Sequence, residues 1–399
     1  MISIGTSPIQ ANPLHSTVRS RAETRTKGGR PRPMATLCAL TAIAAAFFSS
    51  AKSAIAQSAL VMYGVVDTGV RYVEGTSSTT RISTWSVTPG GAAQSLIGLH
   101  GQENLGQGAK AYLRLENRFF GHSGALDPSH PYFSTALLGM ESDRFGRLTL
   151  GRQTNPQADA AVRAFASNPW LPTFYLFRPE ATMAAGAWTD NMLKYTAGVA
   201  NLTFQASQAF GNQPGHMSYG SQSSMSLTYA IDRSFALAAA YLLTRDSTNG
   251  SPAKTWTYGG SYWLGMTRLH LGVAVNRFSQ GFRSFGRYSE ASLAALGMLD
   301  LSARTMYFAG VTQIVGRAHL SANFWRTLQD GDMPSKNGNA TQLQLVANLS
   351  LSKGTALYGE VDYARYSGGL IGAQLQGDTT VMPPVTRQLG AMAGIRHRF

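Results

Sequence analysis

Hydrophobic and polar residues alternate along much of this 399-residue chain, in segments of about ten residues. The segment TQLQLVANLSLS shows the pattern most clearly, because its two faces differ in polarity. One face carries Leu343, Leu345, Ala347, Leu349 and Leu351, and the other carries Gln342, Gln344, Val346, Asn348 and Ser350. A period of two predicts a β-strand, here with one apolar face and one wet face.

Short and long connections alternate between these segments. Seven are short, at 104–108, 142–146, 198–201, 231–234, 265–267, 314–317 and 352–354. Eight are long, at 74–91, 121–130, 154–190, 212–220, 246–254, 280–302, 330–338 and 367–386. Fifteen connections predict sixteen strands, and this asymmetry is typical of an outer-membrane barrel. We therefore predict an all-β, transmembrane, 16-stranded antiparallel β-barrel, which is wide enough to enclose an aqueous channel.

A soluble β-sandwich would explain the alternation equally well. It does not explain why the outward face stays apolar in strand after strand. It also leaves unexplained the aromatic residues at strand ends, in YFST, NRF, ANFW and ARY. After residue 57 the longest apolar run is FALAAAYLL, about half of what a helical membrane span needs. These features favour the membrane barrel.

The N-terminal region predicts export. Residues 34–56 form an apolar stretch that ends in Ala54-Ile55-Ala56 before Gln57, which is the pattern of a signal peptide and its cleavage site. A basic segment, residues 1–33, precedes it. Either this segment is a long n-region or Met34 is the true start, and the sequence supports both. A membrane-anchoring helix is the weaker alternative, because the apolar core is shorter than about 20 residues.

Composition and charge narrow the function further. The net charge is +14, but residues 1–56 hold seven of the 34 basic and one of the 20 acidic side chains, so residues 57–399 carry +8. The remaining basic residues are spread along the chain and form no patch, which disfavours nucleic-acid binding. The single cysteine, Cys38, lies in the predicted signal peptide, so the barrel domain has no disulfide.

Four ordered motifs give the chain a family resemblance. They are SALVMYGVVDTGVRYV, SLIGLHGQENLGQGAKAYLRLENRF, FGRLTLGRQ and the terminal GIRHRF, and they span residues 58–399. Together they resemble the Gram-negative general porins of the beta-proteobacterial type. The resemblance implies a homotrimer in the outer membrane, in contact with lipids and lipopolysaccharide. It also implies passive diffusion of small hydrophilic solutes and ions through a water-filled channel.

In that family the loop after the TLGRQ strand folds into the barrel and narrows it. The resemblance assigns this role to residues 154–190, the longest connection in the chain. Acidic residues of such a loop face basic residues of the wall. The loop here carries Arg163 and Arg178 against Asp159, Glu180 and Asp190, and Lys194 matches a family arginine on the next strand.

The basic ladder of the family is thinned in this chain. Leu96 and His100 stand where the family has Arg and Lys, and Ser134 stands where it often has Arg. Arg114 shares a face with Glu116, which we expect to be the pore side. We predict that Arg114, Lys194 and Arg163 bias the pore mildly towards anions, and that Glu116 and Asp159 oppose them.

The last strand carries a further prediction. Alternation places Ile395, His397 and Phe399 on the lipid side and both terminal arginines on the lumen side, so this strand can pair with the first one. In porins a terminal aromatic residue is read by the outer-membrane assembly machinery. The resemblance therefore assigns Ile395, His397 and Phe399 to an assembly signal.

The sequence contains none of the common catalytic or metal-binding motifs. HExxH, paired CxxC, P-loop and GxSxG motifs are absent from the sequence, and its histidines show no metal-ligand spacing. We therefore predict no cofactor, no metal site and no catalytic residue.

Two alternatives to general diffusion remain. One is a substrate-specific channel with an aromatic track in the 154–190 loop, and the other is an adhesin or receptor acting through loops 280–302 and 367–386.

Overall fold

The computed structural model describes residues 58–77, 79–88, 90–127, 132–166, 187–231, 234–286, 289–295, 298–372 and 384–399. The predicted basic segment, the signal peptide and its cleavage residues Ala54, Ala56 and Gln57 lie outside the described residues. Residues 52–399 form one compact unit, and its described part is almost entirely β-structure.

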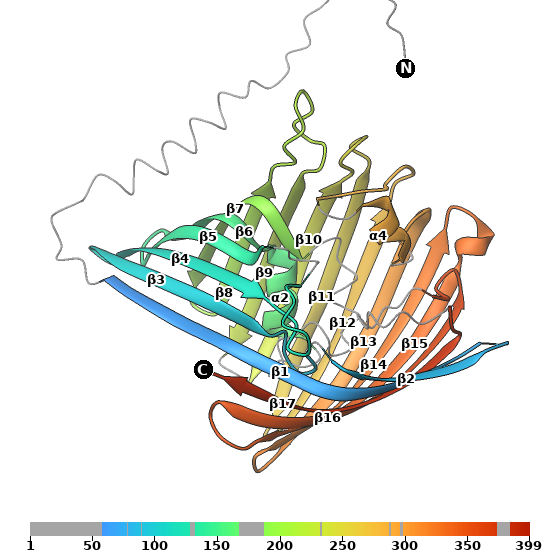
Figure 1. Cartoon of the computed structure of the whole chain (residues 1–399). Helices are drawn as coiled ribbons and strands as arrows, with labels where there is room; N and C mark the ends of the chain where they lie inside the picture. Colours follow the sequence, from blue (N-terminus) through green and yellow to red (C-terminus); the bar gives the residue numbers. More distant parts are fainter. Residues whose placement is uncertain are drawn as a thin grey trace, which may run out of the picture. The chain divides into compact units, whose positions relative to one another are not determined.

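The strands follow one another as an antiparallel series (Figure 1). Their bounds are β1 (Ser58–Thr76), β2 (Arg81–Val87), β3 (Leu96–Gly106), β4 (Ala109–Arg118), β5 (Phe133–Ser142), β6 (Gly146–Thr154), β7 (Trp188–Val199), β8 (Leu202–Ala209), β9 (Gln222–Ile231), β10 (Phe235–Arg245), β11 (Pro252–Leu264), β12 (Thr267–Phe278), β13 (Leu301–Val315), β14 (Ala318–Gly331), β15 (Gly338–Ser350), β16 (Thr355–Gly368) and β17 (Arg387–Arg398). The described parts of the long connections contain three short helices: α2 (Pro156–Ala164), α4 (Glu290–Ala295) and the 3₁₀ turn η1 (Pro334–Lys336).

Seventeen strands occupy sixteen positions in the barrel wall. Strand β1 is long, and on one edge it pairs with β3 through its first half and with β2 through its second half. Strands β2 and β3 therefore share one position beside β1. The other edge of β1 pairs with β17, which closes the sheet on itself. The predicted 16-stranded antiparallel barrel is confirmed.

The two faces of the wall have the predicted polarity. On β15, the side chain of Leu345 is 60% exposed on the outer face, whereas that of its neighbour Gln344 is 1% exposed on the inner face. Leucines 343 and 349 repeat the outward pattern, and their polar neighbours are buried inside. An apolar outer surface is what a bilayer requires, because lipid offers no hydrogen-bonding partner to a polar side chain.

All seven short turns fall at the predicted places, between the paired ends of successive strands. One predicted long connection was wrong. The loop expected at 74–91 contains the end of β1, a tight hairpin and strand β2. In β2, RISTWSV, one face carries Ile82, Thr84 and Ser86 and the other carries Arg81, Ser83, Trp85 and Val87, so both faces mix polar and apolar residues. Such a segment lacks the apolar face that identifies the other strands, so its pattern resembles that of a loop.

One carboxylate ties together the two long loops that follow β10 and β12. Asp246 accepts hydrogen bonds from the backbone amides of Thr248, Arg283 and Ser284, each at 2.7 Å. Burial by itself would raise the pKa of Asp246. The three amide bonds and a fourth from the Thr248 hydroxyl have the larger combined effect, so the pKa of Asp246 lies below its usual value. The connection between β10 and β11 is thereby fixed to the connection that follows β12.

The C-terminal residue completes the closing seam. The backbone amide of Phe399 donates to the carbonyl of Gly64, and the amide of Gly64 donates to the carbonyl of Phe399, both at 3.1 Å. A Cβ at Gly64 would lie 2.4 Å from the Phe399 ring, so the ring lies across the glycine. Phe399 and Ile395 are exposed on the outer face, as expected, and Arg396 is buried inside.

Deleting Phe399 should therefore weaken closure. The deletion removes two backbone hydrogen bonds at the seam and exposes two polar groups of β1, at about 1 kcal/mol or more for each unsatisfied group. We expect lower outer-membrane levels and a lower unfolding temperature, read from the gel mobility of samples heated to a series of temperatures, with near-normal conductance in the molecules that assemble. The matched control is Phe399→Tyr, which keeps the backbone and the ring and should assemble normally. Wild-type levels and stability of the deletion would contradict this role.

Candidate functional site

Helix α2 packs against the inner wall of the barrel. Its start is set locally, because the Asn155 side chain accepts a hydrogen bond from the Ala158 amide at 2.9 Å, and Pro156 follows in the first turn. Asp159 in the first turn suits the positive end of the helix dipole. The buried side of the helix carries Pro156, Gln157, Ala160 and Ala164. The sequence NPQADAAVRA thus specifies a short helix with one small-residue face.

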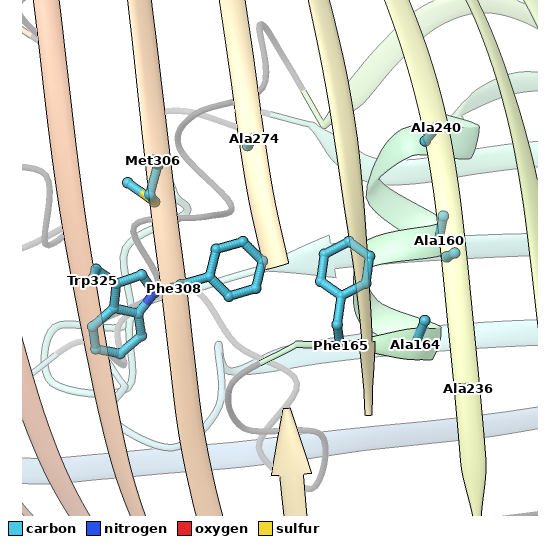
Figure 2. Close-up of a cluster of buried hydrophobic side chains, with 10 residues drawn as sticks. Ala160, Ala164, Phe165, Ala236, Ala240, Ala274, Met306, Phe308 and Trp325 are labelled. Carbon is cyan, nitrogen blue, oxygen red and sulfur yellow. The ribbon is translucent and has the colours of Figure 1, made fainter. Parts of the chain in front are cut away.

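That face packs on the inner wall. Strand β10 presents Ala236, Ala238 and Ala240 inwards, and Ala160 and Ala164 of the helix pack in the same cluster (Figure 2). Small residues on both surfaces allow the helix backbone to approach the wall closely. Polar contacts fix its position: Gln157 donates to the Thr257 hydroxyl at 3.0 Å, and Ser261 donates to the Ala164 carbonyl at 2.6 Å.

The C-terminal end of α2 is held by a cation and an aromatic contact. Buried Arg268 on β12 donates to the Ala166 carbonyl at 2.9 Å and to the Ala164 carbonyl at 3.4 Å. A guanidinium at this end also complements the helix dipole. The ring of Phe165 lies 5.6 Å from that of Phe308 on β13 and covers Gly259, where a Cβ would be 2.6 Å from the Phe165 ring. Helix α2 is therefore fixed at both ends.

Lys194 and Asp159, which we expected to act on the pore in opposite directions, bind each other. The Lys194 ammonium on β7 lies 2.7 Å from the Asp159 carboxylate on α2, and it also donates to the Thr154 carbonyl at 2.7 Å. Gln205 donates to the same Asp159 oxygen at 3.1 Å. The pair joins the first turn of α2 to the wall. Lys194 is only 8% exposed, so its positive charge, next to the carboxylate of Asp159, is largely shielded from water.

Arg114 and Glu116 form a second local pair on β4. The Arg114 Nε donates to a Glu116 carboxylate oxygen at 3.0 Å, and the Tyr63 hydroxyl of β1 donates to that oxygen at 2.8 Å. The Arg114 side chain is 48% exposed and that of Glu116 10%. The structure therefore places both residues on the inner face. It also pairs the cation with the acid that was expected to oppose it.

Arg163 differs from these two cations. It lies in the last turn of α2, on the side of the helix that faces away from the wall, and it is exposed. It forms no ion pair with any of the described residues. Arg163 is thus a positive charge whose field is not cancelled by a neighbouring carboxylate in the described part of the chain. Arg178 of the same loop lies outside the described residues.

The residues that replace the family's basic ladder have different surroundings. Leu96 and His100 lie on the inner side of β3, and the His100 ring is 6.3 Å from that of Tyr112. Ser134 is the extra residue of a β-bulge, because Glu116 pairs with Thr135 and Asn117 pairs with Phe133. Ser134 is buried, and its hydroxyl donates to the Glu116 carbonyl at 3.2 Å. A serine at this place supports the bulge and contacts backbone.

Sequence reasoning missed several buried inner arginines, including Arg118, Arg152 and Arg268. Arg118 stacks over the Trp188 ring at 4.3 Å, Arg152 forms an ion pair with Asp190, and Arg268 holds the end of α2. Alternation gave a signal for Arg118, which lies four residues from Arg114 and hence on the same face. The contacts that these three arginines make could not be predicted, because their partners lie far away in the sequence. In total, the inner wall is more basic than the thinned ladder indicated.

The described residues show little sign of other chemistry. They contain no cluster of three or more histidine, cysteine, aspartate or glutamate side chains able to hold a metal ion. None of the helices in the described ranges is long and apolar enough to cross a membrane. The geometry that is present consists of a closed wall, a polar inner face and an inward helix fixed to that face. This combination defines an outer-membrane channel protein.

Comparisons with known proteins agree with this class. Residues 39–369 match the family model described as Gram-negative porin, and the chain belongs to that family. It is 25% identical over 380 residues to outer membrane porin protein 32 of Delftia acidovorans, over 90% of this chain and 99% of that protein. It is 24% identical over 426 residues to an outer membrane porin protein of Bordetella pertussis, over 90% and 99%.

Solved structures show the same fold. The anion-selective porin from Comamonas acidovorans has a TM-score of 0.68 at 21% identity, over 86% of this chain and 100% of that one. The trimer form of OmpT, an outer membrane protein of Vibrio cholerae, has a TM-score of 0.61 at 14% identity, over 86% and 99%. These comparisons confirm the predicted family and the outer-membrane location. They also confirm the prediction of a channel rather than an enzyme.

The Lys194–Asp159 pair makes a double-mutant test possible. Lys194→Met should leave Asp159 uncompensated beside the pore and raise cation over anion permeability by about two- to fivefold, because a unit charge a few Å from a passing ion contributes on the order of 1 kcal/mol in water. Adding Asp159→Asn should return the ratio close to wild type. Reversal potentials in a salt gradient measure both. If the double variant stayed as cation-shifted as the single one, the two charges would not compensate each other.

Proposed function

We propose that this porin is a general diffusion channel for small hydrophilic solutes and ions, with a mild preference for anions. The observation that carries the anion preference is the unequal pairing of inner charges. Arg114, Arg152 and Lys194 each have a carboxylate partner, whereas Arg163 on α2 has none among the described residues. The net charge of +8 on residues 57–399 points the same way.

The position of Arg163 supports its influence on permeating ions. A charge acts strongly only where the channel is narrow, within a Debye length of about 8 Å at physiological salt. Arg163 lies on the exposed side of α2, the described helix that packs against the inner wall, and we therefore place its guanidinium beside the ion path. Its guanidinium would therefore attract anions and repel cations as they pass.

We further propose a homotrimer that contacts lipids and lipopolysaccharide through its outer face and that is assembled by machinery reading the C-terminal strand. The trimer form of the Vibrio cholerae relative supports the oligomer. The outer face of β14–β17 supports it as well, because Ala322, Ala347, Gly359, Ala391 and Ala393 line a shallow apolar hollow there. Small side chains leave room for a second copy to approach. The exposed ring of Phe399 and exposed Ile395 suit recognition during assembly.

Single-channel recording in planar bilayers tests this function. We expect stepwise conductance, in groups of three if the trimer is right, with a reversal potential on the anion side. Arg163→Gln should reduce anion preference by about two- to fivefold, since one uncompensated charge near the ion path is worth on the order of 1 kcal/mol.

Lys353→Gln is the matched control for that variant. It removes one positive charge from an exposed short turn at the end of the barrel and should leave selectivity unchanged. Absence of conductance steps would refute the diffusion channel. Equal reversal potentials for wild type and Arg163→Gln would refute the charge mechanism while leaving the channel intact.

A further inference from the structure

The wall position shared by β2 and β3 contains an insertion. Strand β2 ends its pairing at Val87 opposite Val70, and β3 begins at Leu96 opposite Val65. Four residues of β1, Val66 to Gly69, thus face eight residues of the partner, Thr88 to Ser95. A regular partner strand would need only four residues to pair with these four residues of β1. The surplus must leave the plane of the sheet, as in an enlarged β-bulge.

This insertion, residues 88–95, turns into the barrel. All of its described residues, 88 and 90–95, are buried. Ala92 packs with Val346, Tyr358 and Met392, which are inward-facing side chains of β15, β16 and β17. Gly91 lies so close to Tyr358 that a Cβ there would be 2.2 Å from the phenol oxygen. The insertion therefore lies flat against the inner wall and occupies part of the barrel's cross-section.

Asp67 is the residue that holds the insertion. It is completely buried on the inner face of β1, and its carboxylate accepts hydrogen bonds from the amides of Gly91 at 2.8 Å and Ala93 at 2.7 Å. The hydroxyl of Tyr358 donates to the same carboxylate at 2.7 Å. Charge-assisted bonds of this kind are about twice as strong as neutral ones. A single carboxylate thus joins β1, β16 and the insertion.

Both ends of the insertion are tied down as well. The amide of Thr88 donates to the Gly69 carbonyl at 2.7 Å, and the Ser95 hydroxyl donates to the Asp67 carbonyl at 3.1 Å. Gln94 donates through its side chain to the Phe119 carbonyl at 3.1 Å. With bonds at its two ends and its middle, the insertion has a defined place inside the barrel.

The insertion and helix α2 lie on opposite walls. Helix α2 contacts β8–β11, centred on β9 and β10, whereas the insertion contacts β1 and β15–β17. Counting β2 and β3 as one position, six strands separate β1 from β9, and six separate β10 from β17 in the other direction. Segments so placed reduce the open cross-section from two sides.

We propose that residues 88–95 are a second pore-narrowing segment, set opposite α2 and positioned by Asp67. This inference rests on the proposed diffusion function, because it concerns the calibre of that channel. On this proposal helix α2 narrows the channel from the β8–β11 side. The insertion accounts for narrowing from the β17–β1 side, so the diameter available to a solute depends on both.

Deleting residues 90–93 tests the proposal directly. The deletion leaves four residues opposite the four of β1, so that β2 and β3 can form one continuous strand. Conductance follows the open cross-section, and we expect single-channel conductance to rise about 1.5-fold, with passage of larger neutral polymers. Gel mobility before and after heating shows whether the variant forms a barrel. Wild-type conductance and polymer cut-off in a correctly folded deletion would overturn the proposal.

Two point variants keep the proposal testable if the deletion fails to assemble. Asp67→Asn can no longer accept from both amides and the phenol, and it should raise conductance or open-channel noise. Tyr358→Phe removes one donor, leaves both amide bonds and should have a smaller effect in the same direction. Unchanged conductance and noise in both variants would overturn the positioning role. A wild type without conductance would instead refute the diffusion channel itself.

Discussion

The structure depends on one constraint: every backbone hydrogen-bonding group of a sheet within lipid must be paired. The constraint is met by the pairing of β1 with β17, from Val65 opposite Arg398 to Thr76 opposite Arg387. Phe399 extends the seam by two more backbone bonds to Gly64. Once the sheet is closed, each strand has an inside and an outside. The apolar alternate residues then face lipid and the polar ones face the lumen.

Closure also makes the inner wall a surface on which other segments can be fixed. Helix α2 uses small residues of β10 and polar residues of β11 and β12. The insertion at 88–95 uses Asp67 of β1 and Tyr358 of β16. In both cases backbone amides or carbonyls that would otherwise be unsatisfied bind side chains of the wall. We propose that the same contacts set the width of the channel and leave some charges uncompensated, so that calibre and selectivity follow from how the segments are anchored.

Much of the fold could be predicted from the sequence because it depends on local patterns. Alternation located the outer leucines of β15, the short turns and the closing strand. Partners across the barrel leave no such pattern. The pairing of Lys194 with Asp159 and the hold of Arg268 on α2 therefore became visible only in three dimensions. The insertion was missed for a similar reason, since β2 lacks an apolar face and the bonds of Asp67 reach residues 24 to 291 positions away.

Strand β1 both closes the barrel and fixes the inward segment beside it. Hydrogen–deuterium exchange of the native protein in bilayer discs tests this double role most directly, because protection reports how often each backbone bond opens. We expect the β1–β17 seam and the amides of Gly91 and Ala93 to exchange as slowly as the β13–β14 pair. Exchange of either region as fast as that of an exposed loop such as 212–218 would contradict this double role.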